Sequence, residues 1–353
     1  MKLSLKRNSN LLTVSFKNAI HDLLQGLSFN LYFRPDRVDV RFTLRCNLRC
    51  RHCFNWSCIS EELNTDIWKE MIIKLKKWLG PFFLIIGGGE PLIRNDLIEL
   101  INFSYKLKIA TALNTNGTLI DKYMADKLVE SSLNMISISI DGFELTHNFL
   151  RGEGTYKKAI NAINYLKGRI ILQIDTVIMD CNLDEILKLV EYAENNKIGI
   201  LFQGLLCGKS APVFSNAQID SLWPKDIKKT SRIFDKLILK KKKSQNIMNS
   251  IRSLQLLKSY YIQSNYNVKY NCQAYKNNFT IFPNGNIRVC PQFGSLGDLT
   301  LSSPKAIWNS KEVFWKRKQM KNCYYPCAFL SCRFRENIFE KILRSKNIFL
   351  MNR

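Results

Sequence analysis

The sequence lacks an uncharged apolar run as long as the roughly 18 residues that a membrane-spanning helix requires. Its basic start also lacks the apolar core of a signal peptide, because the run from Leu11 to Phe16 is short and is followed by Lys17. These two absences argue against membrane-spanning and secreted proteins. We therefore expect a cytoplasmic protein without a membrane span.

Acidic residues are scarce: 29 Asp and Glu stand against 53 Lys and Arg, for a formal net charge of +24. Such a charge suits an anionic partner. The basic residues are scattered, however, and the one dense run, Lys240 to Lys243, lies in a predicted helix where a solvated face is the ordinary interpretation. No RRM or dsRBD signature is present, so we do not expect nucleic acid as a partner.

Cysteine is abundant, with 11 residues, and eight of them lie within 46–53 and 272–332. A chain of 353 residues with 46% hydrophobic content can form a large core plus a smaller domain, so it does not need a disulfide scaffold. Clustered thiols in such a chain favour metal ligation in a reducing compartment.

The first cluster is Cys46-Asn-Leu-Arg-Cys50-Arg-His-Cys53. Three thiols at offsets of four and three residues can bind one soft metal centre without a long loop closure. A closed zinc site or an all-cysteine iron–sulfur cluster takes four protein ligands. Cys58 does not fit as a fourth, so the three thiols suit a cluster with one iron left open.

Apolar runs alternate with amphipathic helical patterns from Val38 to about Leu206, as expected for buried parallel strands in βα units. The expected strands are 38–44, 82–86, 109–113, 136–140, 170–178 and 200–205. The expected helices are 66–79, 96–107, 122–131, 156–167 and 184–195, with Thr65 as the N-cap of the first and Gly80 at its end. The fold class is α/β: a partial TIM-like (β/α)6 barrel followed by a small cysteine-rich α+β domain made of a β-hairpin and a helix.

Polar residues lie where these strands end, at the edge where parallel βα barrels build their sites. They are Cys46, the turn Gly87-Gly88-Gly89-Glu90-Pro91, Asn116, Ser139, Asp141, Thr176 and Gln203. Their common position predicts one site at the carboxyl edge of the sheet.

The spacing C-x3-C-x2-C, with His52 before the last cysteine, resembles the cluster motif of the radical S-adenosylmethionine (SAM) superfamily. The turn 87–91 is similar to the Gly-Gly-Glu-Pro motif of that family, and 137–156 resembles its fourth-strand region. The resemblance implies that Cys46, Cys50 and Cys53 bind a [4Fe–4S] cluster whose fourth iron binds SAM.

The same resemblance implies a set of SAM-binding residues. Gly88, Gly89 and Glu90 contact the methionyl end, and Ser139 and Arg151 bind the ribose and carboxylate. Asp141 is either a ribose ligand or the cap of the following turn, and Asn116 is either a turn residue or a SAM contact. His52 completes the set, whereas His147 is interpreted as structural.

The second cysteine cluster begins at Cys272, and residues 279–289 predict a β-hairpin with a Pro-Asn-Gly-Asn turn before Cys290. Cys323, Cys327 and Cys332 follow, and the absence of histidine here predicts ligation by cysteine alone. The spacing C-x12-G-x4-C is similar to SPASM and twitch domains. Five cysteines in place of seven imply one auxiliary [4Fe–4S] cluster, with one of Cys323, Cys327 and Cys332 spare.

We predict five regions: an N-terminal extension (1–36), the radical SAM partial barrel (37–206), a helical connector (207–265), the twitch/SPASM-like domain (266–335) and a basic C-terminal helix (336–353). The resemblance implies an enzyme that reductively cleaves SAM to a deoxyadenosyl radical, which abstracts hydrogen from a peptide or a small natural-product or sugar-like molecule. The auxiliary cluster implies an oxidation or a cross-link, and the reaction needs an electron donor such as a flavodoxin or ferredoxin. The alternative is a non-catalytic cysteine–metal protein that binds an anionic partner.

Overall fold

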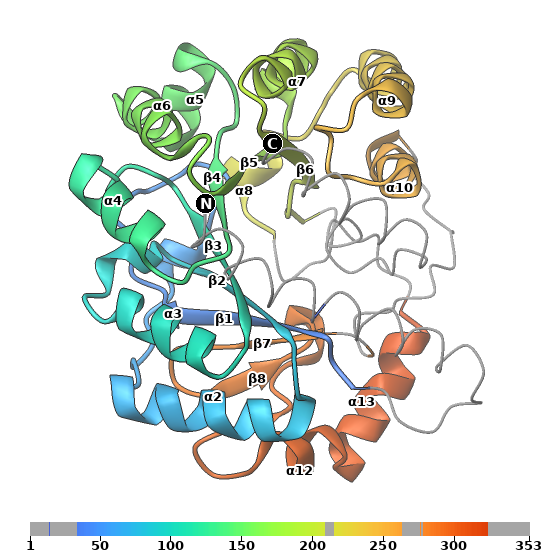
Figure 1. The fold of residues 1–353 in the computed structure, drawn as a ribbon. Helices are drawn as coiled ribbons and strands as arrows, with labels where there is room; N and C mark the ends of the chain where they lie inside the picture. The colour runs from blue at the N-terminus through green and yellow to red at the C-terminus, as the bar shows by residue number, and fades with distance from the viewer. Residues whose placement is uncertain (1–13, 15–33, 209–214, 263–275, 277, 324–353) are drawn as a thin grey trace.

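The computed structural model describes residues 14, 34–208, 215–262, 276 and 278–323 (Figure 1). Several predictions therefore fall outside the described residues: most of the N-terminal extension, the basic C-terminal helix, and Cys272, Cys327 and Cys332. No helix in the described ranges is long and apolar enough to cross a membrane.

Six strands lie side by side in chain order, and each is parallel to its neighbour. They are β1 (Arg37–Thr43), β2 (Phe83–Gly88), β3 (Ala110–Thr115), β4 (Met135–Ser139), β5 (Ile171–Ile178) and β6 (Gly199–Gly204). The sheet is open, with β6 at one end of the order β6-β5-β4-β3-β2-β1-β7-β8-β9. This arrangement confirms the predicted partial (β/α)6 barrel.

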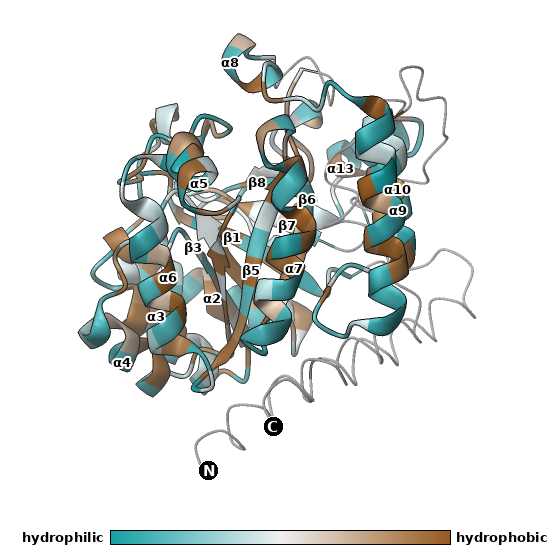
Figure 2. Ribbon diagram, turned by 90° about the horizontal axis from the view of Figure 1, so that it is seen from above, coloured by the Kyte–Doolittle hydropathy of each residue, from teal (hydrophilic) through white to brown (hydrophobic). Residues whose placement is uncertain are grey.

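Helices lie on the outer side of the strands (Figure 1). They are α2 (Thr65–Leu79), α3 (Leu97–Lys106), α4 (Lys122–Glu130), α5 (Glu144–Arg151), α6 (Thr155–Leu166) and α7 (Ile186–Asn195). Short 3-10 helices occupy Asn55–Ser57, Pro91–Ile93, Asp180–Glu185 and Pro291–Phe293. Figure 2 shows hydrophobic and hydrophilic sides on α7, whose Leu189 and Val190 are buried. Burial of one apolar side thus fixes each helix on the sheet.

Helix α2 begins one residue earlier than predicted. Asn64, not Thr65, is its N-cap, because the Asn64 side chain accepts a hydrogen bond from the Ile67 amide at 3.0 Å. The Thr65 hydroxyl instead donates to Asp96 at 2.6 Å. Gly80 ends the helix as predicted, with a positive φ of 69° that favours glycine.

The sheet has one apolar face and one partly polar face. In β1, Val38, Val40 and Phe42 are buried, and the Phe42 ring contacts that of Trp68 in α2 at 4.7 Å. The alternate residues Arg37, Asp39 and Arg41 are partly exposed on the opposite face. Because side chains alternate along a strand, this pattern gives the barrel a polar interior.

The predicted connector forms part of the barrel wall. It contains α8 (Ala217–Asp220), α9 (Ile227–Lys243) and α10 (Ile251–Ile262). The hydroxyls of Tyr260 and Tyr261 in α10 donate to the carbonyl oxygens of Leu205 and Ile178, both at 2.6 Å. These bonds attach α10 to the ends of β5 and β6.

The C-terminal strands extend the barrel sheet. β7 (Asn278–Ile281) is parallel to β1, and β8 (Asn286–Arg288) is antiparallel to β7, which is the predicted hairpin. β9 (Gly297–Asp298), α12 (Pro304–Trp308) and α13 (Lys311–Lys321) follow. The predicted domain boundary at residue 266 remains a prediction, since 263–275 lies outside the described ranges.

Candidate functional site

Three cysteines lie in the loop that follows β1 and line one cavity of about 590 Å³. Cys50 is buried, with 7% of its surface exposed, and Cys46 and Cys53 are partly exposed. Burial raises the pKa of the Cys50 thiol to about 11 and also raises that of Cys46. Without a metal the thiols of Cys46 and Cys50 are therefore protonated at neutral pH, whereas a bound metal would favour their thiolates.

The glycine-rich turn after β2 holds the start of this cysteine loop. The amide of Gly89 donates to the carbonyl oxygen of Thr43 at 3.0 Å, and that of Glu90 to Arg45 at 2.9 Å. A Cβ atom on Gly89 would lie 2.0 Å from the Arg45 carbonyl oxygen. Glycine is required here for contact with the protein's own backbone, in addition to any approach by a ligand.

Glu90 joins the ends of two strands. Its side chain is fully buried and accepts hydrogen bonds from the Thr115 hydroxyl at 2.8 Å, the Asn116 amide at 2.8 Å and the Leu92 amide at 3.1 Å. Burial raises the pKa of this carboxyl. Asn116 in turn donates from Nδ2 to Asn47 Oδ1 at 2.9 Å, which links the turn after β3 to the cysteine loop.

A buried ion pair lies behind Cys50. Arg151 donates from Nε to Asp141 Oδ2 at 2.7 Å, and its Nη1 lies 3.9 Å from Cys50 Sγ. His52 Nε2 lies 3.5 Å from both Arg151 Nη2 and Asp141 Oδ2. Burial opposes ionisation of Asp141, but Arg151 and His52 lower its pKa overall. The positive charge of Arg151 therefore lies next to the cysteine loop.

Most of the predicted SAM-binding residues line the cavity: His52, Gly88, Gly89, Glu90, Asn116, Ser139 and Arg151. Asp141 does not. It is fully buried, and its second oxygen accepts from the Val177 amide at 2.9 Å. Thr176 also points away, since its hydroxyl donates to Ile140 O at 2.6 Å. His147 is buried, and its Nδ1 accepts from the Asp141 amide at 3.3 Å.

Sequence reasoning missed Asp175 in β5, which lines the cavity beside Ser139 of β4. Its carboxylate accepts from Gln173 Nε2 at 2.7 Å and from Gln203 Nε2 at 3.2 Å. Burial raises the pKa of Asp175 to about 7. The sequence pattern could have revealed Asp175, because Gln173 and Asp175 are polar at alternate positions of an otherwise mainly apolar strand.

The other cysteines in the described part of the chain are two candidates for the auxiliary cluster and three that have no predicted ligand role. Cys290 follows β8 and Cys323 follows α13, and both are partly exposed. Their predicted partners Cys272, Cys327 and Cys332 lie outside the described residues. Cys58 is exposed and also lines the cavity, while Cys181 is exposed and Cys207 is buried.

The geometry of the cavity fits a cluster better than a single ion. In the described part of the chain, no three His, Cys, Asp or Glu side chains are placed to hold one metal ion. Zinc needs its sulfur ligands at about 2.3 Å, so they must converge on one point. A cluster distributes its cysteines over separate irons. Three thiols around a cavity that is also large enough for a small-molecule cofactor fit the second arrangement.

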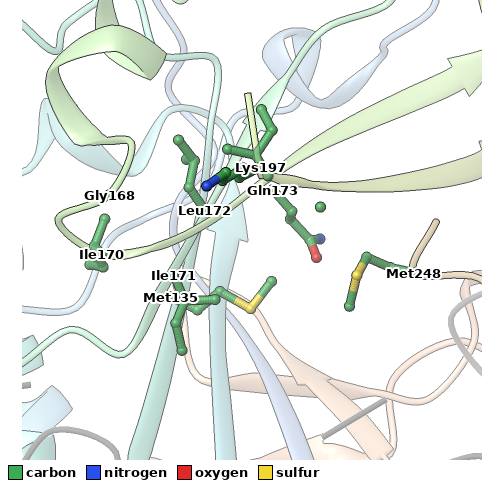
Figure 3. Close-up of a pocket in the computed structure, with 10 residues that line it drawn as sticks. Met135, Gly168, Ile170, Ile171, Leu172, Gln173, Lys197 and Met248 are labelled. Carbon is green, nitrogen blue, oxygen red and sulfur yellow. The ribbon is translucent and has the colours of Figure 1, made fainter. Parts of the chain in front are cut away.

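A second, much smaller cavity lies at the amino ends of β4 to β6 (Figure 3). Its volume is about 20 Å³, roughly the space of one water molecule. Met135, Ile171, Leu172 and Met248 contribute to its lining, with Gln173 and Lys197 as the polar side chains. It lacks the thiols and the two carboxyl groups of the larger cavity and offers no reactive site.

Comparisons with known proteins agree with this geometry. The family model for the radical SAM superfamily matches residues 40–202, and the model for an iron–sulfur cluster-binding domain, SPASM, matches residues 272–333. An AdoMet-dependent heme synthase of Methanosarcina barkeri is 35% identical over 166 residues, which cover 45% of this chain and 47% of that protein. The mycofactocin maturase MftC of Mycolicibacterium smegmatis is 33% identical over 157 residues, 43% and 40% of the two chains. The matched segments span half or less of these relatives.

Two solved structures share the fold. Streptococcus suis SuiB bound to precursor peptide SuiA has a TM-score of 0.64 at 18% identity, over 85% of this chain and 70% of that chain. The protein anSMEcpe with bound AdoMet has a TM-score of 0.63 at 19% identity, over 90% and 96%. The chain therefore carries a radical SAM domain over residues 40–202 and a SPASM-type iron–sulfur cluster-binding domain over residues 272–333.

Proposed function

We propose that this protein is a radical SAM enzyme that modifies a peptide or a small molecule by hydrogen abstraction. The observation that carries the proposal is the position of Cys46, Cys50 and Cys53 around one cavity with the SAM-site candidates. When bound, the cluster and SAM supply reductive one-electron chemistry that removes hydrogen from an unreactive C–H bond.

The chain's own residues bind and position these groups. Cys46, Cys50 and Cys53 would hold the cluster, and the rim formed by Gly88, Gly89, Glu90, Asn116, Ser139 and Arg151 would hold SAM. Arg151 is fixed by Asp141, so its guanidinium keeps one orientation toward Cys50 and is available for a carboxylate. Asp141 acts as a positioning residue, because its carboxylate faces Arg151 and the backbone instead of the cavity.

The C-terminal domain would hold one auxiliary [4Fe–4S] cluster through Cys272 and Cys290 together with two of Cys323, Cys327 and Cys332. Such a cluster accepts an electron and so supports an oxidation or a cross-link. A peptide substrate is supported by the likeness to SuiB and to a mycofactocin maturase, and a small-molecule substrate by the likeness to heme synthases. An external donor such as a flavodoxin or ferredoxin would supply the electron.

A cytoplasmic location belongs to the same proposal. The clustering of the cysteines in a long chain that does not need a disulfide scaffold supports a reducing compartment. The alternative, a non-catalytic cysteine–metal protein with an anionic partner, is not favoured, because curated relatives of the barrel domain are named as synthases and maturases.

Anaerobic reconstitution tests the proposal. We expect about eight irons per chain, the content of two four-iron clusters, and cleavage of SAM on addition of dithionite. Cys50→Ala should lose about four irons and all SAM cleavage, whereas Cys290→Ala should lose the auxiliary irons. Cys181→Ala removes an exposed thiol outside the cavity and is the matched control. Bound zinc without iron, or iron without SAM cleavage in the wild-type protein, would contradict the proposal.

A further inference from the structure

The cysteine loop after β1 presents different side chains on two faces. Every second residue of one stretch lines the cavity: Cys46, Leu48, Cys50 and His52. The residues that alternate with them are exposed and do not line it: Arg45, Asn47, Arg49 and Arg51. The thiols therefore lie on the inner face of the loop and the arginines on its outer face. Of these arginines, Arg45 is already paired with Glu62 at 2.9 Å.

Arg49 and Arg51 keep an uncompensated positive charge on the outer face. Arg49 donates from Nη1 to the carbonyl oxygen of Cys46 at 2.7 Å, and its guanidinium carbon lies 5.2 Å from the centre of the Trp56 ring. Arg51 donates from Nε to the carbonyl oxygen of Phe149 at 2.9 Å, and its guanidinium carbon lies 4.3 Å from the centre of that ring. These partners are neutral, and neither arginine forms an ion pair within the described ranges. The two residues are separated by one position, so their Cα atoms lie within about 7 Å of each other.

Exposed apolar side chains lie next to Arg51. Phe149, whose ring contacts Arg51, is 49% exposed, and Leu145 is 88% exposed. Both belong to α5 and are four residues apart, so they lie on one side of that helix. Arginine and aromatic residues are enriched at protein–protein interfaces, and exposed apolar groups beside them mark such sites. This combination fits a protein partner.

The charge and the position of this surface indicate what kind of protein it binds. Between Leu44 and Ser60 the sequence contains no Asp or Glu, and the whole chain carries a net charge of +24. Complementary charge favours an acidic partner and speeds its approach. A substrate has to reach the cavity, which lies on the inner face of the loop. An electron donor needs only to approach the cluster, and the backbone that carries Arg49 and Arg51 also carries the three cysteines.

We propose that the outer face of the cysteine loop, formed by Arg49 and Arg51 together with Leu145 and Phe149 of α5, is the docking surface for an acidic one-electron carrier protein of the flavodoxin or ferredoxin type. The inference rests on the proposed function, since it places the electron donor of that reaction. In the transfer the carrier loses one electron and the cluster gains it. The carrier approaches from the side opposite the cavity, so it does not compete with the substrate.

A purely structural role for the two arginines makes a different prediction. If their bonds to carbonyl oxygens only hold the loop in place, their loss impairs the cluster and slows SAM cleavage with every reductant. If they bind a carrier protein, their loss slows cleavage with that protein. Cleavage with dithionite then stays unchanged, because so small a reductant needs no docking surface.

Binding is measured first, without turnover. The probes are an oxidised bacterial flavodoxin and an oxidised bacterial ferredoxin, both of net negative charge, and their partner is the anaerobically reconstituted full chain. Biolayer interferometry at about 0.05 M and about 0.3 M NaCl gives the dissociation constants. At least one probe should bind at the lower salt concentration, and its affinity should fall at the higher one, where exposed charges are screened.

Variants of the surface and one control complete the binding experiment. Arg49→Gln and Arg51→Gln should each weaken binding by about threefold. Leu145→Glu should weaken it by about fivefold, because it adds a charge of the same sign as that of the carrier. Leu145 is exposed on a helix outside the loop, so this variant leaves the contacts of both arginines intact. Arg169→Gln removes an equal charge from an exposed ion pair with Asp126 and should leave binding within about 1.5-fold.

The same proteins are then assayed for SAM cleavage at equal iron content. Leu145→Glu should cleave SAM more slowly than the wild-type protein with a subsaturating amount of the reduced probe, and at the wild-type rate with dithionite. Equal slowing with both reductants, no binding of either probe, or equal loss of binding in Arg169→Gln would each overturn the docking surface.

Failure of the docking surface and failure of the proposed function are distinguishable. A protein that cleaves SAM with dithionite but binds the probes equally well in every variant keeps the proposed function and loses the docking surface. A wild-type protein that holds no cluster, or that leaves SAM intact with dithionite, loses the proposed function, and this inference falls with it.

Discussion

The guanidinium of Arg151 donates to the carboxylate of Asp141 at 2.7 Å, and both side chains are almost completely removed from water. Asp141 follows β4, and Arg151 ends α5. The residue before Arg151, Leu150, also accepts a hydrogen bond from the Arg51 amide at 2.8 Å. The ion pair and this backbone hydrogen bond together connect the cysteine loop to the fourth strand.

Removal of one partner of this pair should be much more harmful than removal of both. Arg151→Gln leaves a buried, uncompensated carboxylate, which costs about 3–5 kcal/mol of unfolding free energy. The double variant Asp141→Asn with Arg151→Gln should recover part of the loss, because no buried charge remains. Midpoints of thermal unfolding at one scan rate measure both effects.

The exposed pair of Arg169 and Asp126 has the same 2.7 Å distance and is the control. Its loss in Arg169→Gln should cost less than about 1 kcal/mol, because water screens an exposed pair. A double variant as unstable as Arg151→Gln would show that the ion pair is not the cause.

Replacement of Gly89 by alanine should displace the cysteine loop. The new Cβ would lie 2.0 Å from the carbonyl oxygen of Arg45 and 2.6 Å from the carbonyl carbon of Leu44, and backbone atoms cannot rotate away. We expect a loss of about 3 kcal/mol, the upper range for overpacking, and a reduced iron content.

Gly87→Ala is the matched control for that variant. Its Cβ would lie 3.9 Å from the nearest atoms, those of Asn114, which is ordinary contact. The thermal midpoint and iron content of this variant should stay close to those of the wild-type protein. Similar iron loss in both alanine variants would refute the steric explanation.

Stability should depend on pH through Asp175. Burial raises the folded-state pKa of this carboxyl to about 7, above its ordinary value of 3.8. A raised carboxyl pKa favours the folded state when the group is protonated, so its contribution is lost as pH rises from about 4 to about 7. Asp175→Asn cannot ionise and should remove this dependence.

At about 1.4 kcal/mol per pKa unit, the advantage of Asp175→Asn over the wild-type protein should grow by about 3 kcal/mol between pH 5 and pH 8. Thermal midpoints of both proteins across that range give the measurement. Parallel pH profiles would show that Asp175 titrates at its ordinary pKa.

The barrel and the hairpin should unfold together, because aromatic rings join them. Phe279 of β7 lies 6.2 Å from Trp78 of α2 and 5.7 Å from Trp308 of α12, measured between ring centres. All three are buried. Phe279→Ala should cost about 3–5 kcal/mol and lower a single cooperative transition. Two separated transitions would show that the two parts unfold independently.

Much of the fold was predictable from local pattern. The periodicity of apolar residues predicts strands and helices. The observed bounds of β1 to β6 differ from the predicted bounds by at most two residues. The hairpin around Gly285 was also predictable, because its turn needs a positive φ, here 87°, that glycine adopts readily. The cysteine loop was recognisable because its three thiols are close along the chain.

The sequence by itself therefore determined the six strands of the barrel and five of the helices that cover them, but not α5. It also determined the spacing of the three thiols in the cysteine loop. Only the tertiary structure decided which polar side chains line the cavity. Asp141 contacts Arg151 instead, while Asp175, Arg41 and Arg288 line the cavity. The reason is that side-chain contacts across the sheet depend on strand register and twist. Those are set by packing between segments far apart in the chain, and local spacing does not specify them.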